Sequence, residues 1–391
     1  MTAEVPWAVC TSLGEKTRGA DSGGERGASR AEEGMQMEPT EKVDETRASR
    51  RRGCMLGLAL GDALGAPVEF RRRREILSRY GPDGIEDLHA WGGQPAGTYT
   101  DDGQMSVATA RGILDWRDAT GWAPGSADTP DLDALALAIW ERYMEWSRSP
   151  ECPLGSPGST CLGSIRAGVP LTLSHAVNRQ GKGCGGVMRV APLGLAGLGD
   201  AAFEAGARAA TLTHRHPTSD TSSGFLAALV QRLVDGASLA EAIDAARERL
   251  MQSDGHEETL DVVDTAVCLA GGETDDYRAI GHIGHVGVET EDEHGKGWVA
   301  EEALGIALFC ALRHQDDFPA ALRAAANISG DSDSTASITG AVLGAALGES
   351  VIPRRWVETV QNRELLVALA DRLGEPHPAA GDARAPRATG A

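Results

Sequence analysis

Two short acidic segments hold the residues of this chain that are best suited to metal chemistry. They are Thr100–Asp102 (Thr-Asp-Asp) and Gly330–Thr335 (Gly-Asp-Ser-Asp-Ser-Thr). Each places two carboxylates beside a hydroxyl, and carboxylates this close repel one another unless a cation lies between them. If folding brings the two segments together, four carboxylates and two hydroxyls would form an oxygen-rich site, which suits hard divalent cations such as Mg²⁺ or Mn²⁺.

Each segment also has a simpler interpretation. Thr-Asp-Asp before a helix is equally typical of a helix N-terminus, where the hydroxyl caps the first turn and the carboxylates complement the helix dipole. The Asp331–Asp333 spacing also matches the start of haloacid-dehalogenase-type phosphatases, whose first aspartate is a nucleophile. That motif requires a hydrophobic strand immediately before it, and residues 321–328 instead look helical. The pattern therefore argues against this type of phosphatase.

Two further acids and a histidine could take part in chemistry. Asp62 lies within a glycine-rich helical segment, where we expect it to be a buried, hydrogen-bonded carboxylate. Glu69 lies just after that segment, two residues beyond Pro67, which stops the helix, so it is expected to project from the end of the helix as a candidate catalytic group. His214 is placed at a helix end, where a lone histidine is usually structural.

A glycine-rich loop, Gly181–Gly186, satisfies the pattern G-x-G-x-x-G. No strand precedes it and no βαβ unit surrounds it, so the match to a dinucleotide-binding fingerprint is weak. The loop can still lie against a phosphate or a ribose, because glycine amides approach ligands closely.

The elements that must position these groups are helical almost everywhere. Asp131, Ser238 and Asp333 are expected as helix caps. Glycine recurs at every fourth position from Gly53 to Gly65, which predicts a smooth helix face for close approach of a neighbour. No alternating strand pattern or internal repeat is found, so the sequence predicts an all-α fold, a single compact orthogonal multi-helix domain with ten or more helices. The expected helices include 131–146, 201–212, 239–251, 260–271, 300–313, 319–327 and 334–347.

Composition limits the domain organisation. Residues 1–49 are rich in glycine and charge and are predicted to be a disordered extension, 50–374 a single all-helical domain, and 375–391 a disordered tail. The formal net charge is −20, from 57 acidic and 37 basic residues, which argues against binding to a nucleic-acid backbone.

The remaining bulk features concern membranes and redox state. The sequence has no long apolar run of the kind that spans a membrane, so no membrane partner is expected. It also has no secretory signal pattern at its N-terminus. The seven cysteines contain no C-x-x-C pair, so reduced thiols in a cytoplasmic protein are expected.

Taken in chain order, these motifs resemble the ADP-ribosylglycohydrolase family, which includes the dinitrogenase-reductase-activating glycohydrolase. The resemblance covers about residues 52–348 and rests on five segments, which together are far more specific than any one of them. They are Gly53–Gly65 with Glu69, Thr100–Asp102, Gly185–Pro192, Leu212–His214 and Gly330–Ser334.

The resemblance implies an all-α fold with two divalent metal ions, Mg²⁺ or Mn²⁺, in a cleft. Glu69 would be the acid beside the metals and the candidate general base. The implied metal ligands are Thr100, Asp101, Asp102, Asp331, Asp333 and Ser334. The residues implied to line the ADP-ribose cleft are Gly181, Lys182, Gly183, Cys184, Gly185, Gly186 and His214.

The chain departs from the family pattern at two positions. Ser334 stands where threonine is common, and it keeps the hydroxyl oxygen. Cys184 stands where asparagine is common, which removes an amide that could contact ribose or phosphate. The second change puts the identity of the substrate in question more than the catalytic machinery.

The resemblance implies hydrolysis of ADP-ribose from a modified protein side chain, with N-linked arginine expected and O-linked serine or a small ADP-ribosylated molecule as other substrates. Two different functions stay open from the sequence. One is a relative that binds ADP-ribose or neutralises a toxin without turnover, although retention of every acidic ligand position argues against it. The other is a metal-dependent phosphohydrolase that uses the same ions.

Overall fold

The computed structural model describes residues 39–124, 126, 128–150, 152, 157–168, 181–284 and 296–375. Most of the expected N-terminal extension (residues 1–38) and the tail from residue 376 onward lie outside the described residues. The described α-helices are α1 (Pro39–Gly65), α2 (Arg73–Tyr80), α3 (Asp101–Thr120), α4 (Leu132–Trp146), α5 (Ser159–Arg166), α6 (Ala191–Leu195), α7 (Ala202–Ala210), α8 (Pro217–Val234), α9 (Leu239–Leu250), α10 (Glu257–Ala270), α11 (Asp276–Gly281), α12 (Ala300–Arg313), α13 (Phe318–Ala326), α14 (Ser332–Leu347), α15 (Arg354–Thr359) and α16 (Arg363–Gly374).

The all-α prediction is confirmed. Within the ranges given above, the backbone forms helices and turns but no strand, and its only sheet-like pairings are three isolated bridges. One hydrophobic core extends from Cys54 in α1 to Leu373 in α16. The sequence-based bounds agree closely with the helices, and α12 has the predicted limits.

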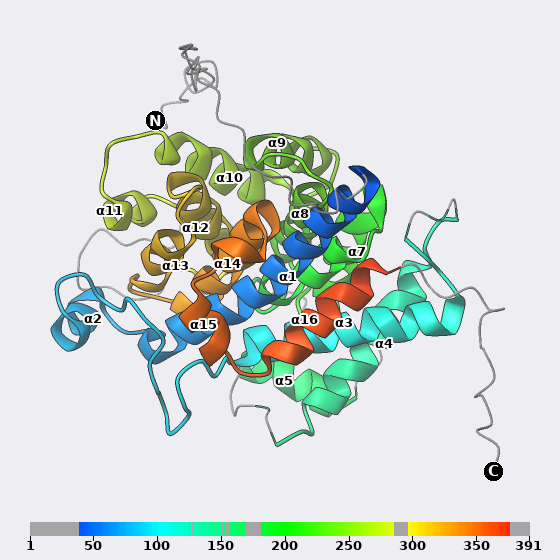
Figure 1. Cartoon of the computed structure of the whole chain (residues 1–391), viewed down its shortest axis with the longest axis horizontal. Helices are drawn as coiled ribbons and strands as arrows, with labels where there is room; N and C mark the ends of the chain where they lie inside the picture. The colour runs from blue at the N-terminus through cyan, green and yellow to red at the C-terminus, as the bar shows by residue number, and fades with distance from the viewer. Residues whose placement is uncertain are drawn as a thin grey trace, which may run out of the picture.

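Helices α1 and α14 form the centre of the molecule and run antiparallel (Figure 1). Their backbones touch along the glycine face that the sequence predicts. A Cβ atom on Gly57 would lie 2.1 Å from the carbonyl oxygen of Gly340, and one on Gly61 would lie 2.0 Å from that of Ala336. This contact places the C-terminal end of α1 beside the N-terminal end of α14.

The other helices cover this central pair. Helix α16 packs along α1, and α12 and α13 pack against α14. Helix α3 contacts α4 and α16, while α8 contacts α7, α9 and α14 (Figure 1). The N-terminal ends of α3 and α14 are thereby both brought to the end of α1.

The boundary predicted at residue 50 is wrong, because α1 already begins at Pro39. The part of α1 just before residue 50 is held by tertiary contacts that composition does not reveal. Arg47 pairs with Asp235 at 3.8 Å, and the Ser49 hydroxyl accepts a hydrogen bond from the Glu349 amide at 3.2 Å.

No single helix among the described residues is long and apolar enough to cross a membrane. One bent pair, Val43–Val68 with Arg73–Tyr80, passes the length and composition test together. Residues 53–68 of that pair are buried inside the protein.

Candidate active site

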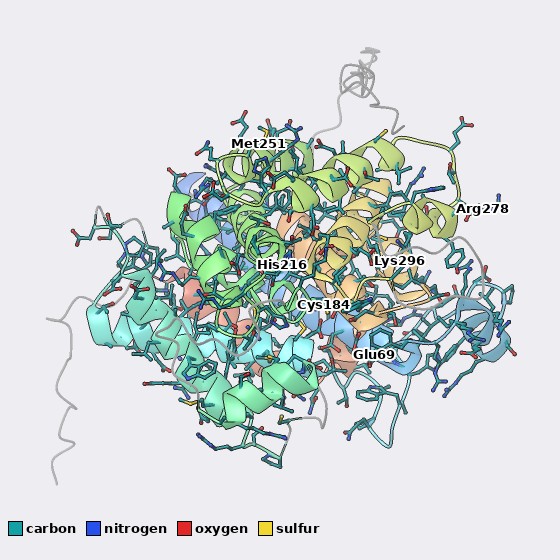
Figure 2. All side chains as sticks on the ribbon, turned by 180° about the vertical axis from the view of Figure 1, so that it is seen from behind. Glu69, Cys184, His216, Met251, Arg278 and Lys296 are labelled. Atoms are coloured by element: carbon teal, nitrogen blue, oxygen red, sulfur yellow. The ribbon has the colours of Figure 1, made fainter. Side chains whose placement is uncertain are left out.

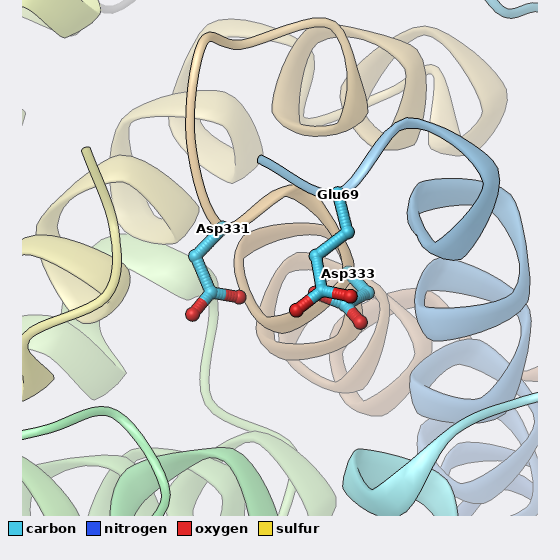
Figure 3. Close-up of side chains that lie close together, drawn as sticks. All are labelled: Glu69, Asp331 and Asp333. Atoms are coloured by element: carbon cyan, nitrogen blue, oxygen red, sulfur yellow. The ribbon is translucent and has the colours of Figure 1, made fainter. Parts of the chain in front are cut away.

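Three carboxylates converge where α1 ends and α14 begins. Glu69 follows a short 3₁₀ turn, Ala66–Val68, and Asp331 and Asp333 lie at the start of α14. Carboxylate oxygens of the three residues all lie within 4.8 Å of one another. Figure 3 shows the three side chains directed into the same space from two chain segments.

The start of α14 differs from the prediction in one detail. The N-cap is Asp331, not Asp333, and Asp331 Oδ1 accepts a hydrogen bond from the Ser334 amide at 3.3 Å. Asp333 is one residue inside the helix and accepts from the same amide at 3.0 Å. Both carboxylates therefore point out of the first turn toward Glu69, and each keeps a second oxygen for another partner.

The first acidic segment joins the same cluster. Asp101 and Asp102 are buried at the start of α3, and the Thr100 hydroxyl lies 3.5 Å from Asp333 Oδ2. Thr100 occupies the N-cap position of α3, but its side chain makes no capping hydrogen bond. The simple helix-cap interpretation therefore fails for this threonine.

Asp62, which lies in α1, caps the N-terminus of α3 in place of Thr100. Its carboxylate accepts hydrogen bonds from the Thr100 amide at 2.8 and 2.9 Å and from the Gly103 amide at 2.8 Å. The expectation of a buried, hydrogen-bonded carboxylate at Asp62 is confirmed. Because Asp62 satisfies the amides, the Thr100 hydroxyl remains available to the cluster.

The electrostatics of the cluster are unfavourable without a cation. Burial first, and then the charge of Asp333, raise the pKa values of Asp62, Asp102 and Asp331 well above the ordinary range. The pKa of Glu69 is raised to about 9, first by the charge of Asp333 and then by burial of the Glu69 carboxyl group, although Glu69 as a whole is exposed. In the part of the chain described, no lysine or arginine forms an ion pair with any of these carboxylates.

The donor set suits divalent cations. Asp102 is 2% exposed, and its Oδ1 atom has no hydrogen-bond partner within the described structure. An unpaired buried carboxylate oxygen is costly unless a positive charge satisfies it. The carboxylates with the Thr100 and Ser334 hydroxyls supply the oxygen ligands that Mg²⁺ and Mn²⁺ prefer.

Backbone hydrogen bonds that the sequence does not signal fix the loop before α14. The Phe70 amide donates to the Gly330 carbonyl at 2.7 Å, and the Asp331 amide donates to the Lys296 carbonyl at 2.8 Å. Phe70 adopts φ of +51°, a strained value for a residue other than glycine. These contacts hold Glu69 and Asp331 on opposite sides of one small space.

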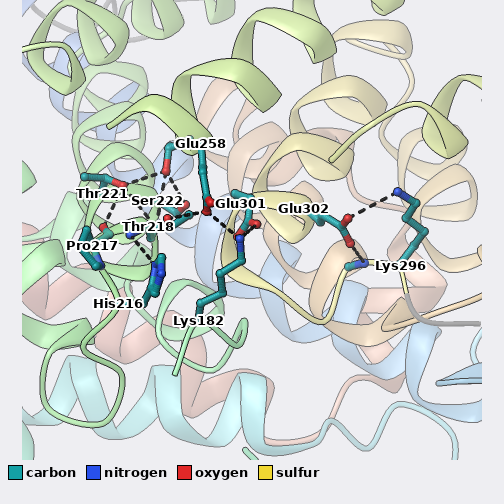
Figure 4. A network of polar contacts seen from close by, with 12 residues as sticks. Lys182, His216, Pro217, Thr218, Thr221, Ser222, Glu258, Lys296, Glu301 and Glu302 are labelled. Carbon is teal, nitrogen blue, oxygen red and sulfur yellow. Dashed lines mark hydrogen bonds and ion pairs between the residues drawn. The ribbon is translucent and has the colours of Figure 1, made fainter. Parts of the chain in front are cut away.

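The Lys296 side chain adds a buried ion pair to this arrangement. Its ammonium group lies 3.4 Å from Glu302 and donates to the Ile283 carbonyl at 2.7 Å. Glu302 also accepts from the Gly297 amide at 3.2 Å. Figure 4 shows this pair beside the network around Lys182.

The predicted glycine loop lies next to the cluster through Cys184. The Cys184 amide donates to the Trp298 carbonyl at 2.8 Å, and its Sγ atom lies 3.2 Å from Asp331 Oδ2. The Lys182 side chain points elsewhere, since it pairs with Glu258 at 2.6 Å and with Glu301 (Figure 4). The loop therefore contributes backbone and sulfur to the site, whereas the Lys182 ammonium is occupied by ion pairs.

His214 packs beneath the glycine loop. A Cβ atom on Gly185 would lie 2.8 Å from His214 Cε1, so only glycine leaves room for the imidazole. The ring Nδ1 is hydrogen-bonded to the Thr213 hydroxyl at 2.8 Å, and Thr213 in turn accepts from Arg189 at 2.6 Å. Burial, followed by the charge of Arg189, lowers the pKa of His214 to about 3, so the ring is neutral at ordinary pH.

This arrangement of acids, glycine loop and helices also agrees with comparison to known proteins. Residues 43–382 match the family described as ADP-ribosylglycohydrolase. The chain belongs to the ADP-ribosylglycohydrolase family. The resemblance inferred from the five motifs is therefore confirmed, and the chain is a hydrolase of the glycosidic-bond class.

Several members of the ADP-ribosylglycohydrolase family are similar over most of their length. The ADP-ribosyl-[dinitrogen reductase] glycohydrolase of Rhodospirillum rubrum is 29% identical, covering 79% of this chain and 89% of the relative. The ADP-ribosylarginine hydrolase Tri1 of Pseudomonas putida is 26% identical, covering 85% and 80%. A solved structure titled ADP-ribosylglycohydrolase-related protein complex has a TM-score of 0.62 and 27% identity, covering 84% of this chain and 98% of that chain.

Proposed function

We propose that this chain removes ADP-ribose from arginine side chains of a modified protein by a reaction that depends on two Mg²⁺ or Mn²⁺ ions. The observation that carries the proposal is the convergence of Asp331 and Asp333 with Glu69 and the Thr100 hydroxyl at one point. The arginine acceptor is supported by relatives whose names specify ADP-ribosylarginine or dinitrogen reductase.

The ions would be held by the two acidic segments. The proposed ligands are the oxygens of Thr100, Asp101, Asp102, Asp331, Asp333 and Ser334. Ions held there would supply Lewis acidity toward the ribose hydroxyls and would lower the pKa of a bound water. The chain itself keeps these oxygens in place through the Asp62 hydrogen bonds and the α1–α14 contact.

Glu69 is the proposed general base. Its side chain projects from the end of α1 toward Asp331 and Asp333 (Figure 3). The largest cause of its raised pKa is the charge of Asp333, and a cation that neutralises Asp333 removes that cause. Glu69 would then be ionised and would accept the proton of the attacking water as the glycosidic bond breaks.

The glycine loop and His214 are proposed to contact the ADP-ribose part of the substrate. Neutral His214 has its Nδ1 atom engaged by Thr213, so Nε2 is the ring atom on the side of Gly183. It can interact there with a substrate without contributing a charge that changes near neutral pH.

Hydrolysis of an ADP-ribosyl-arginine peptide tests the proposal. Asp333→Ala and Asp101→Ala are expected to lose at least two orders of magnitude in rate with Mg²⁺ or Mn²⁺, and wild type is expected to be inactive in EDTA. The matched control is Asp254→Asn, which changes an exposed acid in the turn that follows α9. Full activity of Asp333→Ala, or of wild type in EDTA, would rule out the metal-dependent reaction.

Parallel substrates separate the remaining functions. Serine-linked ADP-ribose tests the acceptor, and phosphate release from ADP-ribose tests for a phosphohydrolase. Stabilisation by ADP-ribose with no hydrolysis of any substrate would indicate a binding protein without turnover.

A further inference from the structure

Cys184 places a sulfur atom at the edge of the carboxylate cluster (Figure 2). The thiol donates to Asp331 Oδ2 at 3.2 Å, and the Ser334 hydroxyl donates to the sulfur at 3.5 Å. The position is set by the backbone, because the Cys184 amide is bonded to Trp298 and its carbonyl accepts from Met188 at 3.0 Å.

A second acid lies close enough to the thiol for its charge to act on the sulfur. Asp102 is 2% exposed, and its Oδ1 atom has no hydrogen-bond partner in the described part of the chain. Burial, the charge of Asp331 and the charge of Asp102 raise the pKa of the Cys184 thiol. Asp102 and Asp331 also repel each other. The sulfur therefore lies against the Asp331 carboxylate, and the buried Asp102 oxygen has no partner among the described residues, so a cation would be favoured here.

We propose that Cys184 gives this centre a second mode of cation binding, in which a thiophilic divalent cation of the Zn²⁺ class is held by the Cys184 sulfur together with Asp331 and Ser334. The inference depends on the metal centre of the proposed function and adds a ligand to it. The thiol proton passes to the buffer as the sulfur–metal bond forms, so that the thiolate is the ligand.

The separations in the structure are compatible with shared coordination. Zn–S and Zn–O bonds of about 2.3 and 2.1 Å, combined with sulfur–oxygen separations of 3.2 and 3.5 Å, give angles of about 93° and 105° at the ion. The sulfur can therefore share an ion with either oxygen at ordinary bond lengths. Asp102 Oδ1, which is buried and has no hydrogen-bond partner among the described residues, is the proposed fourth ligand.

The chemical consequence is a change in metal preference. Oxygen ligands alone suit Mg²⁺ and Mn²⁺, whereas a thiolate selects softer ions such as Zn²⁺. Because Asp331 and Ser334 belong to both ligand sets, the Zn²⁺ mode competes with the Mg²⁺ or Mn²⁺ ion that these two residues would hold. Zn²⁺ is therefore expected to displace Mg²⁺ and to inhibit hydrolysis.

Spectroscopy of the Co²⁺-loaded full chain tests the sulfur ligand directly. Wild-type protein, stripped of metal and kept reduced, should show a thiolate-to-Co²⁺ charge-transfer band in the near ultraviolet. Cys184→Ser and Cys184→Ala should lose that band, and calorimetry should show Zn²⁺ affinity at least tenfold weaker than in wild type. Cys268→Ser, which changes an exposed cysteine, is the matched control and should keep both properties.

The outcomes separate this inference from the proposed function. Visible Co²⁺ bands without a charge-transfer band in wild type would overturn the sulfur ligand and leave the oxygen site intact. A charge-transfer band that persists in both folded Cys184 variants would overturn it as well. Absence of Co²⁺, Zn²⁺ and Mn²⁺ binding would overturn both the inference and the metal centre on which it depends.

Discussion

Substitution of Gly61 by alanine tests whether the α1–α14 contact positions the active site. A Cβ atom there would lie 2.0 Å from the Ala336 carbonyl oxygen, and ordinary contact begins at 3.4 Å, so the helices must separate by about 1.4 Å. Overpacking of this kind costs about 1–3 kcal/mol, and the higher helix propensity of alanine offsets about 1 kcal/mol of it. We expect a fall in Tm of a few degrees.

The same displacement should affect catalysis more strongly than stability. Glu69 is attached to α1 and Asp333 to α14, so separating the helices moves the candidate base away from the acids it faces. A misplacement of about 1 Å can reduce a rate by about 10²-fold. We therefore expect kcat for an ADP-ribosyl-arginine peptide to fall by about that factor in Gly61→Ala, with Mn²⁺ affinity also reduced.

Gly163→Ala is the matched control, because it lies in α5 with no atom within 4 Å of the added methyl group. It should retain wild-type activity and gain up to about 1 kcal/mol in stability. Melting curves and steady-state rates of the two variants answer the question. Wild-type stability and wild-type kcat in Gly61→Ala would refute the reasoning from helix contact to site geometry.

Three other predictions concern charge. Lys296→Met should destabilise the chain by about 3–5 kcal/mol in denaturant titrations, because it leaves Glu302 buried without its cation, whereas Arg354→Met at an exposed pair should change stability by less than about 1 kcal/mol. The free energy of unfolding of the metal-free protein should fall as pH rises from about 5 toward 9. The pKa of Glu69 is near 4.5 in the unfolded chain and about 9 in the folded one, so the folded state binds more protons in this range. Saturating Mn²⁺ should abolish the trend, which denaturant unfolding at several pH values with EDTA or with Mn²⁺ would measure. His214 should stay neutral in ¹⁵N NMR spectra down to pH 5, and an imidazolium titrating near 6.5 would contradict its assigned environment.

Local patterns in the sequence were sufficient to predict most of the helical framework. Asp131 and Ser238 cap their helices as expected, with side chains that accept from amides in the first turn. The glycine spacing in α1 also predicted a close helix contact, because a four-residue repeat places glycine on one helix face. These features depend on neighbours within a few residues, which the sequence displays directly.

Features that depend on distant residues could not be predicted in the same way. Nothing in the pattern around Lys296 indicates a buried ion pair with Glu302 or a carbonyl that fixes Asp331. The domain boundary was placed at residue 50, too far along the chain, because the polar residues just before it are stabilised by contacts with distant residues. The sequence likewise predicted that a neighbouring helix packs against Gly61, but it did not indicate that the neighbour is Ala336 in α14.

The acidic segments illustrate how structure separates a helix cap from a functional site. Capping α14 requires only Asp331, and capping α3 is performed by Asp62. Asp102 and Asp333 are buried carboxylates that neither task requires, and their mutual repulsion opposes folding. Groups that oppose folding without serving the fold are typical of functional sites. The cation that would relieve this repulsion is also the one that the proposed hydrolysis needs, so metal affinity, stability above neutral pH and activity should rise and fall together across variants of these two aspartates.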